Sequence, residues 1–286
     1  MEQKGPSRTA IGTAVHRAAH LLLDEDPKIL VDPFARAFAG YASDAEMLQA
    51  LASLEMIAFP RMRAVFTLRS RYAEDELAGA IIRGIDQYII LGAGLDSFAY
   101  RRPDLVALLD VFEVDHPASQ AWKRARVAEL GIAAPTHLHH VSIDFERQTL
   151  ADGLADSIVD LSKPVFLSLL GVTQYLTTDA TLRTLRDVVT TTAPGSELVF
   201  QFVMPPATLA GDEAALVTAF AERNGAAGEP WLSYFEPAEM ERNLLVAGFS
   251  RVVHFGAAEA TERYLRGRSD GLCMPAYFHM IKASIA

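Results

Sequence analysis

Cysteine is nearly absent from this chain of 286 residues, which has Cys273 alone. A single cysteine cannot form an intrachain disulfide, and a zinc site of the Cys/His type would need a second one. The sequence therefore predicts no metal site and a reducing, cytoplasmic location. We expect Cys273 itself to be a small buried residue near the last strand, as free cysteines usually are.

Long apolar runs and an excess of positive charge are also missing. No run approaches the ~20 apolar residues that a membrane-spanning helix needs, and residues 1–17 lack the apolar stretch of a signal peptide. The chain has 26 lysines and arginines against 36 aspartates and glutamates, a net charge of -10. An acidic chain is a poor partner for a phosphate backbone, so the sequence predicts binding to neither nucleic acid nor membrane. It leaves the oligomeric state open.

Apolar material is plentiful: 50% of the residues are hydrophobic and 22% are charged, enough for a large core. Residues 1–84 have helical spacing and no strand pattern. From residue 85, short apolar runs alternate with helical segments, which is typical of βαβ units in a doubly wound α/β sheet. We expect a single domain over 1–286, with a helical cap at 1–84 and a Rossmann-like core at 85–286.

The expected elements follow from this alternation. Strands are predicted at 87–91, 108–114, 138–141, 164–170, 197–203, 250–255 and 277–281. Helices are predicted at 13–24, 32–38, 44–58, 62–83, 117–130, 178–190 and 237–247. An insertion at 205–235, with an Ala-rich helix at 211–223, interrupts the pattern. We expect it to form a lid together with the N-terminal helices.

Gly92-Ala93-Gly94 directly follows the first predicted strand. Glycines there let the backbone turn sharply and let a ligand approach where no Cβ intervenes, although many such turns contain glycine for structural reasons alone. The dinucleotide fingerprint GxGxxG would need glycine at 97, where Ser97 stands. This departure disfavours NAD and favours a nucleoside cofactor without a pyrophosphate.

Acids and aromatics follow the next two strands. Glu113 and Asp115 end the second strand roughly 20 residues after the glycine turn, where a carboxylate can accept hydrogen bonds from both hydroxyls of a ribose. Asp144 and Phe145 follow the third strand, where they could contact an adenine. Asp144 is almost equally well explained as the N-cap of a helix beginning near residue 146.

The run from Leu169 to Leu176 lies at and beyond the end of the fourth strand, at the edge where a methyl donor and its acceptor would meet. Gln174 and Tyr175 offer polar groups that could orient an acceptor, although a buried tyrosine is usually a packed core residue. We take both as candidate catalytic residues, together with His116, which follows the acid of the second strand.

The ordered runs LRSRYAEDEL, YIILGAGLDSFAYR, FEVDHPASQAWKRARV, VSIDF and GVTQYL resemble the S-adenosylmethionine-dependent methyltransferases related to leucine carboxyl methyltransferases. The resemblance extends from about residue 9 to the C-terminus and includes DPFARAF near residue 32. The bacterial branch of that family includes enzymes that methylate carboxyl groups of polyketides. The resemblance implies a class I methyltransferase fold and S-adenosyl-L-methionine as the cofactor.

The resemblance also implies roles by position. Arg71, the second arginine of the RSR run, matches the arginine that binds the methionine carboxylate, because forked guanidinium donors suit a carboxylate. The other cofactor-binding positions are Gly92, Gly94 and Asp96 of the turn, Asp115 with Glu113 for the ribose, Asp144 and Phe145 for the adenine, and Leu170. The family often has a glutamate where Leu170 stands, which puts that polar contact in doubt.

The acceptor side is less defined. His16, on a predicted N-terminal helix, could line a substrate pocket, although an exposed helix face fits it better. Trp231 and Tyr234 of the insertion would give the lid an aromatic wall, or would simply anchor it to the core. His137, His139 and His140 cluster with no evident acidic partner, and they do not predict a metal site.

The predicted reaction is O-methylation of a small-molecule acceptor, most simply a carboxylate. A carboxylate is ionised at neutral pH and needs no general base, whereas a phenol needs one, for which either His16 or His116 could serve. The alternatives are methylation of a protein C-terminal carboxylate, methylation of a phenol, an NAD-linked oxidoreductase, and a non-catalytic module that binds a nucleoside cofactor.

Overall fold

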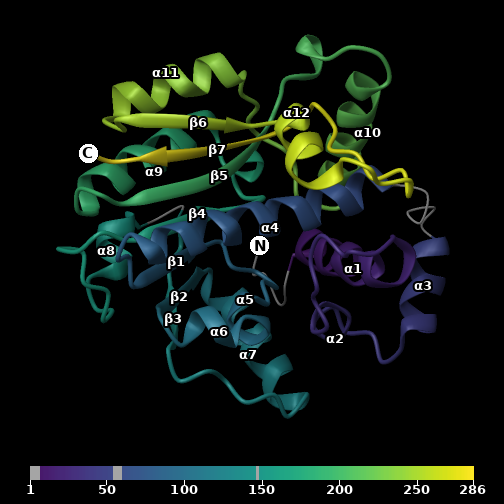
Figure 1. Ribbon diagram of the computed structural model, residues 1–286, viewed down its shortest axis with the longest axis horizontal. Coiled ribbons are helices and arrows are strands. Elements are labelled where there is room, and N and C mark those ends of the chain that lie inside the picture. Colours follow the sequence, from purple (N-terminus) through teal and green to yellow (C-terminus); the bar gives the residue numbers. More distant parts are fainter. Residues whose placement is uncertain (1–6, 54–59, 146–147) are drawn as a thin grey trace.

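The computed structural model of the chain describes residues 7–53, 60–145 and 148–286. Seven strands form one sheet in the order β3-β2-β1-β4-β5-β7-β6, and Figure 1 shows them from β6 at the top to β3 at the bottom. All neighbours are parallel except β7, which is antiparallel to both β5 and β6. The strands are β1 Gln87–Leu91, β2 Asp110–Asp115, β3 Leu138–Ser142, β4 Phe166–Leu169, β5 Glu197–Val203, β6 Arg251–Phe255 and β7 Phe278–Ser284.

Both faces of the sheet are covered, which explains the continuous apolar runs of the central strands. In β1 the side chains alternate, so that Tyr88 and Ile90 join one buried cluster while Ile89 and Leu91 join another. The first cluster packs the sheet against α4 Pro60–Ile82, α5 Phe98–Arg101, α6 Pro103–Val106 and α12 Ala257–Ala260. The second packs it against α8 Leu150–Leu154, α9 Thr178–Thr191 and α11 Pro237–Ala247.

The N-terminal helices gather beside one end of the sheet, on the right of Figure 1. They are α1 Arg8–Leu23, α2 Ala35–Phe38 and α3 Asp44–Ser53, and α4 leads from them into β1. The carboxylate of Asp32 accepts from the amides of Phe34 and Ala35 at 3.2 and 3.0 Å, just before α2. The part of the predicted helix 44–58 beyond Ser53 lies outside the described residues.

The insertion after β5 contains a short 3-10 turn, Pro206–Thr208, and helix α10 Glu213–Ala226. The remaining helix is α7 Pro117–Glu129, after β2. Two single turns complete the list: a 3-10 turn at Thr173–Tyr175 and a π-helical turn at Thr261–Leu265.

Cys273 is exposed, so its predicted burial is wrong. It belongs to the irregular segment before β7, in which the side chains of its two neighbours, Leu272 and Met274, are buried. No helix in the described ranges has the length and apolar character of a membrane span.

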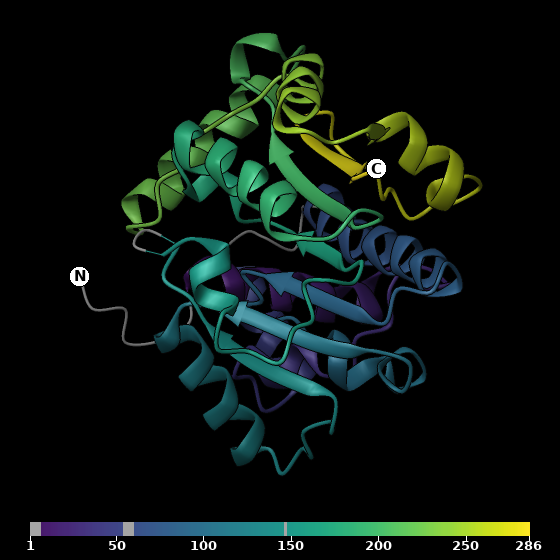
Figure 2. The ribbon, with the colours of Figure 1, turned by 90° about the vertical axis from the view of Figure 1, so that its left-hand side faces the viewer.

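The topology places two neighbouring strands on opposite sides of β1. Because β2 and β4 flank β1, the chain runs in opposite directions across the sheet after the first and third strands, which creates a crevice at their carboxyl ends. The arrowheads of β1 and β2 point to the same side in Figure 2. The glycine turn, the acids after β2 and the segment after β4 therefore meet at one edge of the sheet.

Candidate active site

A cavity of about 1340 Å³ lies at this edge, between the strand ends and helices α1, α4 and α10. Most of the residues predicted from sequence line it. They are His16, Gly92, Gly94, Asp96, Asp115, His116, Asp144, Phe145, Leu170, Gln174, Tyr175 and Trp231. Three predicted residues do not line it: Arg71, Glu113 and Tyr234.

The glycine turn needs glycine for reasons of space as well as conformation. Gly92 has φ +70°, and a Cβ there would lie 2.4 Å from Cγ2 of Val172. The amides of Gly92 and Ala93 both donate to the carbonyl oxygen of Val114, at 2.8 and 3.1 Å, which holds the turn against the end of β2. The backbone of the turn therefore forms part of the cavity wall itself.

We expect Gly92→Ala to lower the free energy of unfolding by about 3 kcal/mol. A left-handed backbone costs a residue with a Cβ ~1–2 kcal/mol, and the overlap with Val172 costs a further ~1–3 kcal/mol. Gly131→Ala is the matched control, because Gly131 has φ +65° and nothing within 4 Å of a built Cβ. Urea denaturation should show about 1–2 kcal/mol for the control, and equal losses in the two variants would contradict the overlap.

Asp115 lies at the end of β2, facing the glycine turn. One carboxylate oxygen accepts from the amide of Gly94 and the other from the amide of His116 at 2.7 Å. Burial raises the pKa of this carboxyl group, and the two amide donors act in the opposite direction. The side chain lines the cavity and keeps lone pairs for further donors, as ribose hydroxyls would be.

Glu113, which the sequence predicts beside the ribose, does not line the cavity. Its side chain is 1% exposed and forms an ion pair of 2.7 Å with Nζ of Lys123 on α7. Neighbouring Asp115 reaches the cavity because it ends the strand, whereas Glu113 is enclosed between β2 and α7. Burial raises the pKa of Glu113.

The arginine of the RSR run that faces the cavity is Arg69, whereas Arg71, which the sequence predicts at the cofactor, does not line it. Successive side chains on a helix are ~100° apart, so residues two positions apart point to nearly opposite sides. Arg71 instead donates to Asp75 at 2.9 Å and to the carbonyl of Ile29 at 3.3 Å. Its guanidinium also lies 5.7 Å from the ring centroid of Tyr264.

Arg69 is a cation without a carboxylate partner among the described residues. Its guanidinium donates to Oε1 of Gln201 at 3.2 Å and lies 4.8 Å from the ring centroid of Phe66. Burial lowers the pKa of Arg69 to about 10, so the side chain remains charged at neutral pH. Because enclosed charges are normally paired, this guanidinium is suited to an anionic group of a ligand.

Asp144 and Phe145 both line the cavity beyond β3. The helix after them, α8, begins at Leu150 and is capped by Thr149, which accepts from the amide of Asp152 at 3.1 Å. The predicted start of this helix near residue 146 lies outside the described residues. The N-cap of α8 is therefore Thr149 and not Asp144, whereas Asp144 forms part of the cavity wall.

The cavity also holds three buried polar atoms that lack a hydrogen-bond partner among the described residues. They are Nε2 of His16, Oε1 of Gln174 and Nε1 of Trp231. All three residues line the cavity, whereas Tyr234 packs against the apolar core that includes Phe278. Since nearly all buried polar groups are paired, three such atoms around one space indicate a place for a polar ligand.

The cluster of histidines on β3 has an acidic partner after all. Asp110 accepts from His139 at 2.8 Å and is 3.3 Å from Nδ1 of His137. Among the described residues there is no group of three or more ligands that could hold a metal ion.

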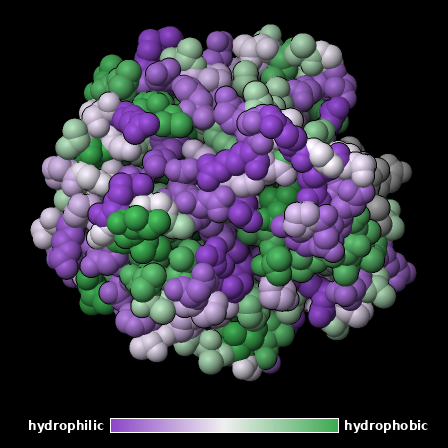
Figure 3. All heavy atoms as spheres, in the orientation of Figure 1, coloured by the Kyte–Doolittle hydropathy of each residue, from purple (hydrophilic) through white to green (hydrophobic). Residues whose placement is uncertain are grey.

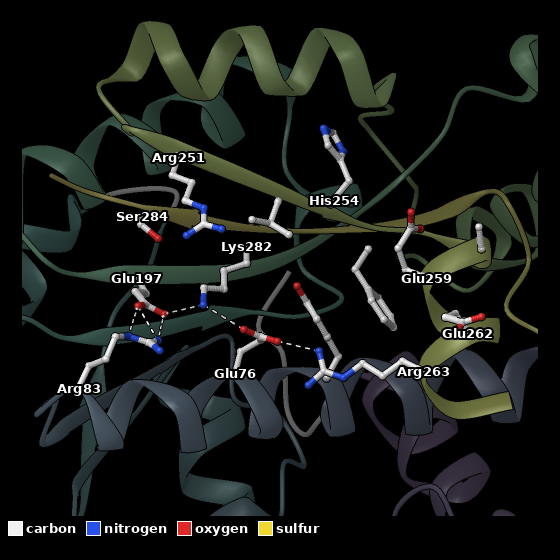
Figure 4. A pocket seen from close by; sticks show the side chains of 14 residues that line it. Glu76, Arg83, Glu197, Arg251, His254, Glu259, Glu262, Arg263, Lys282 and Ser284 are labelled. Carbon is white, nitrogen blue, oxygen red and sulfur yellow. Dashed lines mark hydrogen bonds and ion pairs between the residues drawn. The ribbon is translucent and has the colours of Figure 1, made fainter. Parts of the chain in front are cut away.

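A second cavity, of about 860 Å³, lies between α4, β6, β7 and α12, outside the crevice (Figure 4). Its charges largely pair with one another: Glu197 with Arg83 and Lys282, and Glu76 with Lys282 and Arg263. A band of hydrophilic side chains crosses the middle of this face of the molecule (Figure 3). Because these side chains already neutralise one another, they do not need a charged ligand, and we do not take this cavity as the active site.

Fold and cavity together define a class. The sheet order with an antiparallel β7, and a cavity at the β1 crevice with a glycine turn and a ribose-type acid, are those of a class I S-adenosylmethionine-dependent methyltransferase. The profile of the family "Leucine carboxyl methyltransferase" matches residues 10–189. The chain belongs to the leucine carboxyl methyltransferase family, and its cofactor is S-adenosyl-L-methionine.

Two bacterial relatives illustrate the similarity. One, from Bacillus subtilis, has the provisional name S-adenosyl-L-methionine-dependent methyltransferase YktD and is 34% identical over 215 residues, 75% of this chain and 70% of that protein. Another, from a Parafrankia species and with the same kind of provisional name, is 35% identical over 205 residues, 69% of this chain and 63% of that protein.

Two solved structures share the fold. One, a provisionally named methyltransferase from Thermobifida fusca, has a TM-score of 0.60 and 18% identity, and the match covers 100% of this chain and 97% of that one. The other, a DUF574 family protein from Streptomyces avermitilis, has a TM-score of 0.61 and 16% identity, with 98% of each chain covered. At these identities the similarity establishes the fold alone.

Proposed function

We propose that this methyltransferase transfers the methyl group to an oxygen atom of a small-molecule acceptor. The observation that carries the proposal is the division of one cavity into two parts. One part has the glycine turn, Asp115 and Arg69, and the other has the unpartnered polar atoms of His16 and Trp231. A cofactor and an acceptor can therefore meet in one enclosed space.

The residues present fit S-adenosylmethionine. Arg69 is suited to its methionine carboxylate, the glycine turn to its methionine and ribose part, and Asp115 to its two ribose hydroxyls. Asp144 and Phe145 would contact the adenine. When bound, the cofactor supplies a methyl group already activated by the positive charge of a sulfonium. The protein has to orient the acceptor oxygen and exclude water.

The wall of the acceptor side is aromatic and closed by the insertion. Phe66, Phe220, Trp231 and Phe278 line the cavity. The carboxylate of Glu229, in the insertion, accepts from the first two amides of α1, those of Arg8 and Thr9, at 2.8 and 3.1 Å. We propose that the insertion at 205–235 and the N-terminal helices form a lid. A lid closed in this way favours a small apolar acceptor over the C-terminus of another protein.

Methyl transfer from labelled S-adenosylmethionine tests the proposal. We expect label in small aromatic acceptors that carry an oxygen nucleophile, and none in peptides that end in a free carboxylate. Transfer to the peptides alone would replace the small-molecule reading by the protein-directed one. The sequence predicts a carboxylate acceptor because it identifies no definite base, and the two histidines that could serve as one, His16 and His116, both line the cavity.

A further inference from the structure

The imidazole of His16 is oriented by its own helix. The residue is 2% exposed, and its Nδ1 is 2.7 Å from the carbonyl oxygen of Gly12, four residues earlier in α1. A carbonyl oxygen only accepts hydrogen bonds, so Nδ1 carries the proton. Nε2 is therefore left with a buried lone pair that has no hydrogen-bond partner in the described part of the chain, in a residue that lines the cavity.

The surroundings keep this imidazole neutral. Burial, together with the charges of Arg63 on α4 and Arg223 on α10, lowers the pKa of His16 to about 4. The Arg63 guanidinium is itself paired with Asp24 at 2.7 Å, and the imidazole packs against Phe66 with ring centroids 5.1 Å apart. At neutral pH the atom offered to a ligand is a hydrogen-bond acceptor, and its complement is a donor.

We propose that the acceptor is an aromatic hydroxyl compound whose O–H donates to Nε2 of His16, and that His16 takes this proton during methyl transfer. The inference rests on the proposed function and narrows it. The aromatic wall of Phe66, Trp231 and Phe278 suits a flat ring. A carboxylate would bring an anion with no proton against the lone pair of Nε2, which disfavours it.

The step balances with His16 as the proton acceptor. The acceptor oxygen forms a bond to the methyl carbon, and the methyl–sulfur bond breaks with its electron pair left on sulfur. The O–H electron pair stays on oxygen while the proton moves to Nε2. One positive charge enters on the sulfonium and one remains on the imidazolium. A weak base is sufficient because a methylated hydroxyl that still holds its proton is far more acidic than an imidazolium.

The test uses two probes that differ only in the nucleophile, 2-naphthol and 2-naphthoate, with labelled S-adenosylmethionine and the full chain. We expect transfer to 2-naphthol, giving a base-stable methyl ether. His16→Gln and His16→Phe should lower kcat/KM for it by about 100-fold or more, with the Kd for S-adenosylmethionine changed less than twofold. His137→Gln, at an exposed histidine, is the control and should behave as wild type. Transfer only to 2-naphthoate, or a His16→Gln variant with unchanged kcat/KM, overturns the proposal.

A second measurement decides the case in which neither probe is methylated. In ¹⁵N spectra of histidine-labelled protein with bound S-adenosylhomocysteine, we expect His16 at pH 7 as the tautomer with the proton on Nδ1, and a shift of its Nε2 resonance when 2-naphthol is added. A protonated Nε2, or no shift with 2-naphthol, overturns the proposal. Failure of S-adenosylhomocysteine to bind would instead contradict the proposed function, so the two failures are distinguishable.

Discussion

Replacing Arg69 by alanine should raise the Kd for S-adenosylmethionine by roughly 100-fold, which corresponds to about 3 kcal/mol. The guanidinium is a partly enclosed cation with no carboxylate partner among the residues described, so its strongest partner is the anionic end of a ligand. Removing it leaves the ligand carboxylate desolvated and unpaired, which is the costly case for a buried charge. Calorimetric titration of the purified variant measures the effect.

Arg71→Ala is the matched control for this prediction. The same number of atoms and the same charge are removed two residues away, but Arg71 is bound to Asp75 and to the carbonyl of Ile29, outside the cavity. We expect a Kd within about threefold of wild type, since a half-exposed pair of this kind is worth ~1 kcal/mol or less even to the fold. A large loss in Arg71→Ala with a normal Arg69→Ala would restore the assignment made from sequence.

Replacing Lys123 by methionine should destabilise the protein by about 3–5 kcal/mol at neutral pH. The change leaves Glu113, which is 1% exposed, as a buried carboxylate without its 2.7 Å ion pair. The double variant Glu113→Gln/Lys123→Met removes both charges, so we expect it to regain most of the loss. Because Glu113 lies outside the cavity, the double variant should bind S-adenosylmethionine as wild type does.

The loss in Lys123→Met should also depend on pH. Burial already raises the pKa of Glu113 above the ordinary 4.5, and removal of the cation raises it further. The loss in free energy of unfolding is therefore largest above this raised pKa, where folding must bury an ionised carboxylate. The loss decreases as the pH falls through the raised pKa, because Glu113 then takes up a proton in the folded state. Urea denaturation of the variant and of wild type at two pH values measures it. A penalty that is equal at both would show that Glu113 is not the cause.

The sheet could be predicted from sequence because its strands are short apolar runs that end in turn residues, such as Gln87 to Leu91 before Gly92. A predicted strand boundary differs from the structure where an apolar residue is exposed. The sequence predicts that the second strand begins at Leu108, but Leu108 is 58% exposed and the strand begins at Asp110. The burial of Cys273 was mispredicted because residue type alone carries no information about the irregular segment that holds it.

Residues of the cavity wall could be predicted where they stand at a strand end, as Gly92 and Asp115 do. Arg69 was missed because a run with arginines two apart does not say which side of the helix faces the sheet edge. Which side of α4 faces the sheet edge is decided by how the helix packs against the rest of the protein, and the sequence of the run does not contain that information. Glu113 was misplaced because its partner, Lys123, is ten residues away on the next helix.

His16 shows what only coordinates supply. The sequence placed it on a helix that could cover the cavity, but the proton on Nδ1 follows from one 2.7 Å contact with Gly12. The lone pair of Nε2 and its missing partner follow from burial among α1, α4 and α10. These two features of His16 support our proposal of a hydroxyl acceptor in place of the carboxylate predicted from sequence.

The most direct test of the account is a comparison of S-adenosylhomocysteine with 5′-methylthioadenosine, which lacks the amino-acid part and its carboxylate. Both are titrated calorimetrically into the wild type and into Arg69→Ala. We expect the wild type to prefer S-adenosylhomocysteine by about 100-fold, the equivalent of about 3 kcal/mol, and the variant to lose most of that preference. A preference that is unchanged in Arg69→Ala would contradict the placement of the cofactor in this cavity.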